Sequence, residues 1–430
     1  MKKIAFHTLG CKLNFAETSA IASRIQNYER TDIKNPADIY VINTCTVTEN
    51  AEKKLKELVR RLKRRNPRAK IVAVGCLAQR DPQGASRIPG IDLVLGMEEK
   101  FRLEEFLPAL EKGMLPPVIA RTPPDRADFF PAFSATDRTR AFLKIQEGCD
   151  YPCTYCIIPR ARGKSRNPAI EQITEQARQI GQKGIKEIVL TGVNIGTFQD
   201  FSGNKPRKFL DLLRALDEIK EVERYRISSI EPNLLTPEII RFVLLESKKF
   251  LPHFHMPLQS GSNEILAKMK RRYRRELYAD RVKMIKDIDP DAAVGTDVIT
   301  GFPGETEEKF RETYEFLKDL PVSYLHVFPY SDRPGTEASR MEGKIAAREI
   351  HARSRLLREL SQRKRLLFAR SQEGKIRPVL VERSIKDGYL TGWTDNYLKV
   401  RLPYREDLPN SIVRVRLGPV QGEHSEAVAL

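Results

Sequence analysis

The chain has 430 residues, more than one ordinary hydrophobic core accommodates, so we expect two or three domains. No run approaches the roughly 18 consecutive apolar residues that span a bilayer, and no signal-peptide core follows the N-terminus, which argues against a membrane protein and predicts a cytoplasmic location. Lys and Arg outnumber Asp and Glu by 75 to 57, a formal charge of +18 that favours a polyanionic partner such as nucleic acid over a basic protein without one.

Residues 1–112 alternate short apolar runs with helical stretches, the pattern of a parallel α/β sheet covered by helices. The expected strands are Ile4–Thr8, Ile39–Asn43 and Ile71–Val74, and the expected helices are Phe15–Tyr28, Asn50–Arg65 and Glu98–Leu110. From 113 to 138 the periodicity lapses and five prolines occur, so we expect this segment to be a linker.

Residues 139–370 repeat the strand-then-helix alternation six times, which predicts a partial (β/α)6 barrel whose chemistry sits at the carboxyl ends of its strands. The expected strands are 141–146, 187–191, 224–229, 254–257, 293–300 and 324–328. The expected helices are 170–183, 206–219, 237–247, 262–270, 276–288 and 305–317, and a basic helix is expected over 346–371.

Residues 371–430 have a different pattern from the preceding regions. Short expected strands follow one another, with turn residues such as Asp387-Gly388 and Pro409-Asn410 between them. Strands are expected at 378–382, 389–394, 397–401, 411–417 and 426–430. Five strands in this space predict a small antiparallel β-barrel. The whole chain is therefore expected to be an α/β protein with three domains.

Three cysteines, Cys149, Cys153 and Cys156, lie on one short segment directly after the first strand of the predicted barrel. Three thiolates on a short loop hold three corners of a [4Fe–4S] cube and leave the fourth iron open to bind a ligand and pass it an electron. The alternative is a zinc site, which normally has four ligands. A fourth ligand has no local candidate, because none of the six histidines lies at knuckle spacing.

The other three cysteines are far apart in the sequence but share one position. Cys11, Cys45 and Cys76 each follow a predicted strand, and Gly10 and Gly75 directly precede two of them. Because the carboxyl ends of parallel strands meet at one edge of a sheet, we expect a second site with three thiolates there. The alternative is three unrelated buried thiols.

The cysteine segments resemble those of the radical S-adenosylmethionine (SAM) methylthiotransferase family. The resemblance covers the cluster loop Gly148–Gly163 (GCDYPCTYCIIPRARG) and the N-terminal motifs Thr8–Asn14 (TLGCKLN), Asn43–Thr48 (NTCTVT) and Val74–Ala78 (VGCLA). Pro257–Ser262 (PLQSGS) and Gly295–Glu305 (GTDVITGFPGE) also fit, and the C-terminal barrel resembles a TRAM domain, so the likeness covers the whole chain.

This resemblance implies a tRNA-modifying enzyme with two [4Fe–4S] clusters and SAM. The cluster on Cys149, Cys153 and Cys156 would bind SAM and cleave it to a 5′-deoxyadenosyl radical. The cluster on Cys11, Cys45 and Cys76 would hold a sulfur that a second SAM methylates. The methylthio group would be inserted at C2 of adenine, where no acidic proton is available to general-base chemistry.

The N-terminal motifs most resemble the branch of the family that acts on N6-threonylcarbamoyladenosine next to the anticodon. The branch that modifies isopentenyladenosine typically reads Gly-Cys-Gln-Met-Asn, and the ribosomal-protein branch reads Gly-Cys-Pro-Lys-Asn, whereas Lys12 and Leu13 match neither. Methylthiolation of isopentenyladenosine or of a ribosomal protein residue stays the alternative within this chemistry. A non-catalytic, zinc-stabilised RNA-binding protein is the alternative from another class.

Six further residues are expected near the SAM pocket. Tyr155 precedes Cys156 and either packs on the SAM adenine or is an ordinary core aromatic. Gly192 and Asn194 follow the second strand, where such barrels approach the SAM amino group. Glu231, Gln259 and Arg271 follow the third and fourth strands, and we expect them to bind SAM polar groups or to play a structural role.

The expected partners are the tRNA anticodon stem-loop, an electron donor protein and a sulfur donor, with no membrane. Basic residues at 60–65 and 363–365 and on the terminal barrel are expected to contact the tRNA backbone. Tyr389, Trp393 and Tyr397 on that barrel are candidates to stack on bases.

Overall fold

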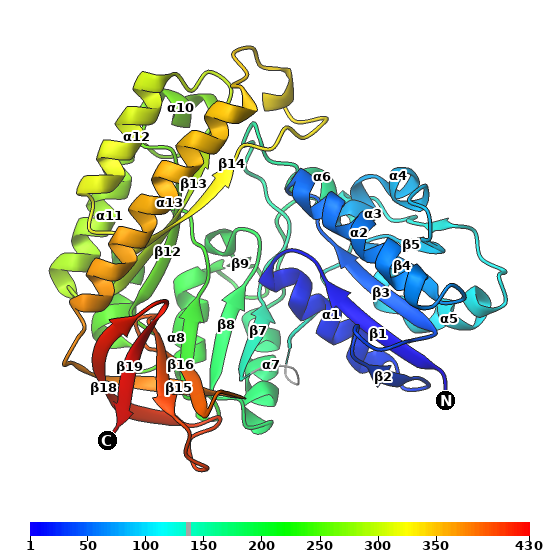
Figure 1. Cartoon of the computed structure of the whole chain (residues 1–430), viewed down its shortest axis with the longest axis horizontal. Helices are drawn as coiled ribbons and strands as arrows, with labels where there is room; N and C mark the ends of the chain where they lie inside the picture. Colours follow the sequence, from blue (N-terminus) through cyan, green and yellow to red (C-terminus); the bar gives the residue numbers. More distant parts are fainter. Residues whose placement is uncertain (135–138) are drawn as a thin grey trace.

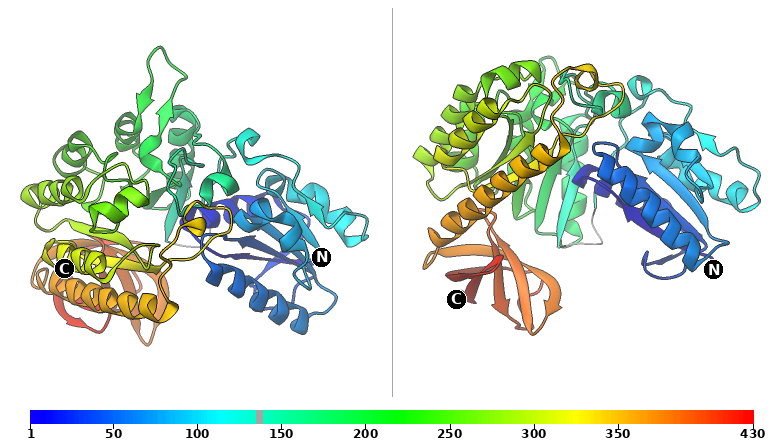
Figure 2. Two further views of the ribbon diagram at one scale, coloured as in Figure 1. Left: turned by 90° about the horizontal axis from the view of Figure 1, so that it is seen from above. Right: turned by 45° about the horizontal axis from the view of Figure 1, so that its top comes forward.

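The computed structural model describes residues 1–134 and 139–430 and shows three units (Figure 1). An N-terminal α/β unit lies beside a central barrel of parallel strands, and a small closed β-barrel lies below the central one. Figure 2 shows the same three units from above and from an oblique angle. The expected α/β class with a C-terminal β-barrel is confirmed.

The N-terminal unit is a six-stranded parallel sheet in the order β2-β1-β3-β4-β5-β6. Its strands are β1 Lys3–Thr8, β2 Glu29–Thr31, β3 Ile39–Thr44, β4 Lys70–Gly75, β5 Leu93–Leu95 and β6 Val118–Ile119. Its helices are α1 Lys12–Arg24, α2 Glu49–Arg65, α3 Cys76–Arg80, α4 Pro82–Ser86 and α5 Leu103–Glu111, with a 3-10 turn η1 at Glu99–Arg102. Strand β3 is buried along its whole length because helices cover both of its faces.

Strand β6 lies inside the segment expected to be a linker. Val118 pairs with Val94 and Ile119 with Leu95, so this part of the chain closes the edge of the sheet. The sequence pattern does not predict this strand, because the strand is two residues long and follows Pro116 and Pro117. A 3-10 turn η2 follows at Pro124–Arg126, and the last expected linker residues, 135–138, lie outside the described part.

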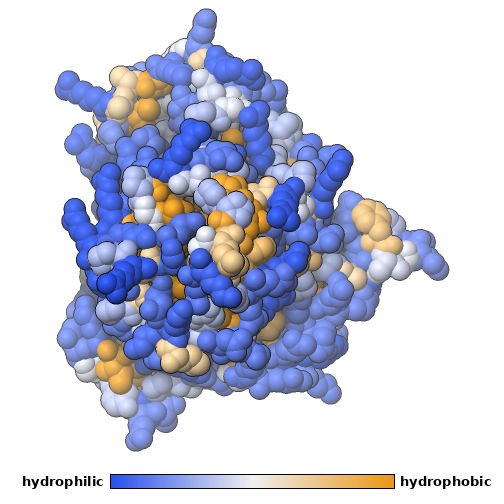
Figure 3. All heavy atoms as spheres, turned by 90° about the vertical axis from the view of Figure 1, so that its right-hand side faces the viewer, coloured by the Kyte–Doolittle hydropathy of each residue, from blue (hydrophilic) through white to orange (hydrophobic). Residues whose placement is uncertain are grey.

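The basic run at 60–65 belongs to α2, an amphipathic helix with its apolar face on the sheet. Leu55, Leu58, Val59 and Leu62 are buried at helical spacing. Lys63 is not a free surface cation, since its ammonium lies 2.9 Å from an Asp92 carboxylate oxygen. Arg60, Arg61, Arg64 and Arg65 are exposed. The face of the molecule in Figure 3 is mostly hydrophilic, with an apolar patch near its centre.

The central barrel consists of two three-stranded parallel sheets, and all six expected strands are present. The first sheet holds β7 Arg140–Lys144, β8 Glu187–Thr191 and β11 Arg224–Ile227, and the second holds β12 His253–Gln259, β13 Ala293–Thr300 and β14 Tyr324–Pro329. Parallel bridges from Tyr225 to Phe250 and from Ser229 to His255 join the two sheets between β11 and β12. The strands therefore follow one another in chain order around an open barrel.

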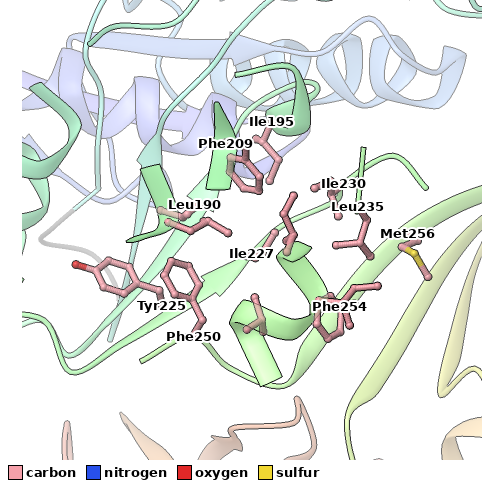
Figure 4. Close-up of a cluster of buried hydrophobic side chains, with 14 of the residues drawn as sticks. Leu190, Ile195, Phe209, Tyr225, Ile227, Ile230, Leu235, Phe250, Phe254 and Met256 are labelled. Carbon is pink, nitrogen blue, oxygen red and sulfur yellow. The ribbon is translucent and has the colours of Figure 1, made fainter. Parts of the chain in front are cut away.

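Helices cover the outside of this barrel. They are α7 Ile170–Gln182, α8 Phe209–Asp217, α9 Pro237–Arg241, α10 Asn263–Lys268, α11 Arg275–Ile288, α12 Glu307–Asp319 and α13 Ala347–Arg370, whereas α6 Ile158–Arg162 packs against α3 of the N-terminal unit. Between the first sheet and its helices, Leu190, Ile227, Phe209 and Tyr225 are among the buried side chains that form one apolar core (Figure 4). A short hairpin, β9 Gln199–Asp200 and β10 Arg207–Lys208, projects from the barrel (Figure 2).

The C-terminal unit is a closed five-stranded barrel in the order β15-β16-β17-β19-β18. Its strands are β15 Ile376–Lys386, β16 Tyr389–Thr394, β17 Lys399–Pro403, β18 Ile412–Gln421 and β19 His424–Ala429. Four of the neighbouring pairs are antiparallel as expected, but β17 and β19 run parallel where the barrel closes. A closing pair joins strands that are distant in sequence, and turn residues give no information about such a pair.

The C-terminal barrel is attached to the central barrel by buried arginines. Arg224 donates to the Trp393 carbonyl, and Arg226 donates to the carbonyls of Thr394 and Asp395. Glu187 holds both arginines, with oxygens 2.6 Å from Arg224 and 3.1 Å from Arg226. One buried carboxylate therefore orients the groups that bind the two units together.

We expect Glu187→Gln to destabilise the fold and to change its response to acid. Burial alone would raise the pKa of Glu187, but Arg224 and Arg226 outweigh burial and lower this pKa to about 2. The carboxylate thus adds stability above its unfolded pKa, about 4.3, and this contribution is lost as the pH falls toward 2. At pH 7 the variant should lose about 3 kcal/mol of unfolding free energy, because two buried cations lose their partner.

Urea unfolding between pH 2 and 7 checks this expectation. Glu223→Gln is the matched control, because Glu223 forms an exposed ion pair with Lys186 at the surface. The stability difference between the Glu187 variant and the wild type should shrink as the pH falls below 4.5. A difference that is constant with pH would contradict the role of the carboxylate charge.

No helix in the described parts of the chain has both the length and the apolar character needed to cross a membrane.

Candidate functional site

The first group of thiols, called here the barrel trio, consists of Cys149, Cys153 and Cys156. All three lie on the loop that leaves β7 at the carboxyl end of the barrel. Gly148 turns the chain with a φ of +70°, and a Cβ there would lie 1.9 Å from the Lys164 carbonyl oxygen. Only glycine permits this close approach, which places the Cys149 amide 3.0 Å from the Gly163 carbonyl.

Gln146 connects this loop to the loop after β8. Its side-chain amide donates to the carbonyls of Glu147 and Gly148 at 2.9 and 2.8 Å. Its oxygen accepts from the backbone amides of Val193 and Asn194 at 3.0 and 2.9 Å. Gly192 is needed here, because a Cβ on it would lie 2.8 Å from the Gln146 carbonyl oxygen. The cysteine loop and the Gly192–Asn194 segment are thus held as one assembly.

Three of the residues expected near SAM gather around the barrel trio. The Asn194 side-chain nitrogen lies 3.9 Å from the Cys149 sulfur, and its buried oxygen has no partner among the described residues. Arg271 lies 3.1 Å from the Cys153 sulfur and forms an ion pair with Glu231. A buried amide oxygen without a donor, beside a cation and a carboxylate, is suited to a ligand with an amino and a carboxylate group.

The other two expected residues lie at the same end of the barrel. The Tyr155 hydroxyl accepts from Arg271 at 3.3 Å, and its ring packs edge-on against Phe302 at 6.5 Å between centroids. Gln259 ends β12 in a left-handed conformation, with a φ of 67°. A non-glycine residue in this region is strained, and such strain is typical of binding sites.

The second group of thiols, called here the N-terminal trio, consists of Cys11, Cys45 and Cys76. Cys11 precedes α1, Cys45 follows β3 and Cys76 begins α3 directly after β4. Strands β1, β3 and β4 are neighbours in the sheet, so the three loops meet at one edge. A Cβ on Gly10 would lie 2.9 Å from the Cys45 Cβ, which shows how closely the first two loops approach.

Asn14 fixes the loops of the N-terminal trio to one another. Its side-chain nitrogen donates to the carbonyls of Leu9 and Thr44, both at 3.0 Å. Its oxygen accepts from Arg162 at 2.7 Å. One buried amide therefore joins the loop of Cys11, the loop of Cys45 and the central barrel.

Burial makes two of the six thiols unreactive as free cysteines. Burial is the main cause that raises the pKa of Cys45 and of Cys156 to about 12 each. A free thiol there stays protonated at neutral pH and is inert, whereas a bound metal displaces the proton. The donor sets of both trios, three cysteines each, fit a four-iron cluster with one open iron.

The spacing of the sulfurs disfavours zinc. A tetrahedral zinc ion with bonds of about 2.3 Å holds its sulfur ligands about 3.8 Å apart. Within the described residues, one group of three His, Cys, Asp or Glu ligand atoms has all its members within 4.8 Å of one another, and it contains no cysteine. Neither trio is as compact as a single zinc ion requires.

Arg162 links the two trios, and sequence reasoning did not single it out. It ends α6, the helix that begins two residues after Cys156, and α6 packs against α3 of the N-terminal unit. Its guanidinium lies 3.3 Å from the Cys76 sulfur and holds Glu17 at 2.8 and 2.9 Å. The side chain is 1% exposed. The element that follows the barrel trio therefore contacts a thiol of the N-terminal trio.

Arg162 is part of a buried charge network between the two units. Glu17 also holds Lys100 at 2.7 Å and Lys144 at 3.3 Å, and Lys144 lies 2.7 Å from Glu147. Burial would raise the pKa of Glu17, but Arg162 and the two lysines lower it well below its usual value. Arg166 also lies 2.9 Å from Glu147, so four cations face two carboxylates, and an anionic ligand on the N-terminal trio would offset the excess positive charge.

Lys12 follows Cys11 and forms no ion pair with any residue that the structure describes. Water reaches its side chain, yet burial by the surrounding protein lowers its pKa. Nearby charges act on this pKa as well: Tyr397 and Glu187 raise it, and Arg140 and Arg226 lower it. Lys12 is thus a cation without an ion-pair partner among the described residues, and groups of both barrels act on its charge.

Two of the three aromatics expected to stack on bases make ring contacts within the protein. Tyr397 stacks on His253 at 4.2 Å and on Trp393 at 4.7 Å between ring centroids. Arg140 lies over the Trp393 ring and Arg401 over the Tyr389 ring. Trp393 and Tyr397 therefore belong to the contact between the two barrels.

Two parts of the chain match known protein families, and the fold resembles solved structures. Residues 143–317 match the radical SAM superfamily, and residues 3–96 match an uncharacterized protein family, UPF0004. Among solved structures, the radical SAM methyltransferase TsrM from Kitasatospora setae has a TM-score of 0.55 at 13% identity, over 78% of this chain and 77% of that chain. At this identity the likeness concerns the fold alone.

Curated relatives match nearly the whole chain. Threonylcarbamoyladenosine tRNA methylthiotransferase MtaB of Bacillus subtilis is 42% identical over 97% of this chain and 94% of its own length. MtaB of Aquifex aeolicus is 41% identical over 93% and 96%. The tRNA-2-methylthio-N(6)-dimethylallyladenosine synthase of Aquifex aeolicus is 34% identical over 97% and 96%. The chain belongs to the radical SAM tRNA methylthiotransferase family, and it is an enzyme.

Proposed function

We propose that the protein inserts a methylthio group at C2 of N6-threonylcarbamoyladenosine next to the anticodon of tRNA. The proposal includes two [4Fe–4S] clusters, one on each cysteine trio, and SAM as both methyl donor and radical source. The observation that carries it is the placement of two separate thiol trios at the carboxyl ends of two parallel sheets, joined through Arg162. When bound, the clusters and SAM supply the radical and sulfur chemistry that side chains lack.

The residues of this chain would bind and orient the cofactors. Cys149, Cys153 and Cys156 would hold one cluster, and Asn194 and Arg271 are positioned to bind polar groups of SAM beside it. Tyr155, Glu231, Gly192 and Gln259 would complete that pocket. Cys11, Cys45 and Cys76 would hold the second cluster, with Arg162 beside Cys76 balancing its negative charge.

Substrate choice would depend on Lys12. The threonylcarbamoyl group carries a carboxylate, whereas the isopentenyl group is apolar and uncharged. An unpaired ammonium next to Cys11 suits an anionic base modification. An apolar modification would leave this ammonium without a partner. This charge complementarity favours the threonylcarbamoyl substrate, and so does the higher identity to MtaB of Aquifex aeolicus, 41%, than to the dimethylallyladenosine synthase of the same organism, 34%.

The proposed partners are the tRNA anticodon stem-loop, an electron donor protein and a sulfur donor, all in the cytoplasm. The formal charge of +18 supports the tRNA, because cations that neutralise phosphates release condensed counterions. An electron donor is needed because SAM is cleaved by reduction, and a sulfur donor is needed because the inserted sulfur leaves with the product.

Lys12→Gln should lower kcat/KM for an anticodon stem-loop that carries threonylcarbamoyladenosine by about 10- to 100-fold, since a charged hydrogen bond contributes about 1.5–3 kcal/mol. Single-turnover assays on the reconstituted enzyme, with the product nucleoside measured by mass spectrometry, check this value. Lys54→Gln is the matched control, because Lys54 is exposed on α2.

A second substrate separates recognition from general damage. With a stem-loop whose adenosine lacks the threonyl carboxylate, Lys12→Gln and the wild type should react at similar, low rates. An equal loss on both substrates would show that Lys12 acts on the cluster or the fold and not on the carboxylate.

A further inference from the structure

Three ligand-type side chains outside both cysteine trios converge inside the central barrel. They are His255 on β12, Asp297 on β13 and His326 on β14. Asp297 pairs directly with His326 across the sheet, and His255 pairs with Gly295, two residues before Asp297. Alternate residues of a strand point to one face, so neighbouring strands bring the three side chains together.

The three ligand atoms form a nearly equilateral triangle. The His255 Nε2 and the His326 Nδ1 each lie 3.2 Å from the Asp297 Oδ1, and the two nitrogens are 3.3 Å apart. Around an ion with bonds of about 2.0–2.1 Å, ligand atoms are about 3.3–3.4 Å apart in tetrahedral geometry and about 2.8–3.0 Å apart in octahedral geometry. The triangle has the size of one face of such a coordination shell.

Hydrogen bonding alone explains the triangle less well. If both ring nitrogens carried protons toward Asp297, two donors would face each other at 3.3 Å. If only one did, the other imidazole would direct a lone pair at a carboxylate oxygen 3.2 Å away. A cation between the three atoms removes both repulsions, because each atom then offers a lone pair to the ion.

The surroundings orient the ligands and leave one side open. The Ser229 Oγ lies 2.7 Å from the His255 Nδ1, so a proton held there leaves Nε2 free to bind metal. The His326 side chain is 45% exposed and lines a cavity of about 680 Å³ with Tyr324, Arg365 and Tyr397. The cavity therefore borders the triangle at His326.

We propose that His255, Asp297 and His326 bind one divalent transition-metal ion, separate from the iron of the cysteine trios. Two imidazoles and one carboxylate with open positions suit Zn²⁺ or Fe²⁺ and disfavour Mg²⁺ and Ca²⁺, which prefer oxygen ligands. The site requires no cysteine, and so does not depend on the clusters that the proposed function requires.

Equilibrium dialysis of the reconstituted full-length enzyme against Zn²⁺ tests the site. Elemental analysis should find one zinc per chain in addition to the iron. Asp297→Asn and His326→Gln should each weaken zinc binding by at least about 100-fold, and Ser229→Ala by about 10- to 100-fold, as expected for a ligand and for an outer partner of a ligand. His351→Gln, on α13 outside the triangle, is the matched control and should bind zinc like the wild type.

A crystal structure of the zinc-loaded enzyme would locate the bound zinc ion. An anomalous signal at the zinc edge, centred between His255, Asp297 and His326, is the expected result. Equal zinc binding by the wild type and both ligand variants, or zinc located on the cysteines, would overturn the site. Absence of binding by a wild type with full iron content would overturn it as well, while leaving the proposed function intact. Because His326 is half exposed, His326→Gln keeps the test valid if Asp297→Asn fails to fold.

Discussion

Anaerobic reconstitution of Cys153→Ala should give about four irons per chain instead of about eight, because one of two four-iron cubes is lost. The variant should form no 5′-deoxyadenosine from SAM under reduction. Cys153 lies on the loop that Gly148 and Gln146 fix in place, and Arg271 lies 3.1 Å from its sulfur. Removing this ligand should therefore abolish SAM cleavage while the N-terminal cluster stays intact.

Cys45→Ala is the matched variant in the other trio. It should also lose about four irons, yet it should still cleave SAM, because the barrel trio lies on a different loop. Iron analysis and chromatography of 5′-deoxyadenosine give both readouts on the same preparations. Loss of SAM cleavage in both variants to the same extent would contradict two separate sites. A wild type that binds zinc and no iron would favour the zinc-stabilised RNA-binding protein.

Glu17→Gln should destabilise the chain by about 3–5 kcal/mol, the usual cost of leaving buried cations without their partner. Glu17 is fully buried and holds Arg162, Lys100 and Lys144. In the variant, Lys144 and Arg162 keep Glu147 as a partner, whereas Lys100 loses the one carboxylate that it contacts among the described residues. Because the pKa of Glu17 lies well below its usual value, its contribution is present at neutral pH and is lost progressively as the pH falls below the unfolded pKa of about 4.3.

Chemical unfolding of the apo protein measures this loss. Glu105→Gln is the control, since Glu105 forms a bidentate pair with Arg102 at the exposed start of α5 and should change stability little. The network also joins the N-terminal unit to the central barrel. At a temperature where Glu17→Gln stays folded, methylthiolation should fall more than SAM cleavage, since only the former needs both trios. Equal stability of Glu17→Gln and Glu105→Gln would contradict the network's role.

The sequence reveals the cysteines and the strands that carry them, because strand-end placement in a parallel sheet is a local pattern. Cys11, Cys45 and Cys76 converge because β1, β3 and β4 are neighbours, and expected strands 187–191 and 293–300 agree with β8 and β13. Strand β6 was missed because two residues give no periodicity. The parallel contact of β17 with β19 was missed because local turn signals do not report long-range pairing.

The sequence did not predict the side-chain networks between distant segments, and these matter more for the site than the missed strand. Arg162 stood within a recognised motif, but nothing in its spacing indicates that it meets Glu17, 145 residues earlier in the chain. His255 and His326 are far apart in the sequence, and their spacing does not predict that they meet. The register between β12, β13 and β14 brings them together. Trp393 and Tyr397 were expected to stack on bases, because their positions in the sequence do not show that they pack between the two barrels.

The central claim is the modification of threonylcarbamoyladenosine, and nucleoside analysis of tRNA tests it most directly. Total tRNA from cells with and without the gene would be digested and its nucleosides measured by mass spectrometry. Cells without the gene should lack 2-methylthio-N6-threonylcarbamoyladenosine and accumulate its unmethylthiolated form, and a plasmid copy should restore the product. Unchanged 2-methylthio-N6-threonylcarbamoyladenosine, above all with loss of the isopentenyl counterpart, would contradict the proposed substrate.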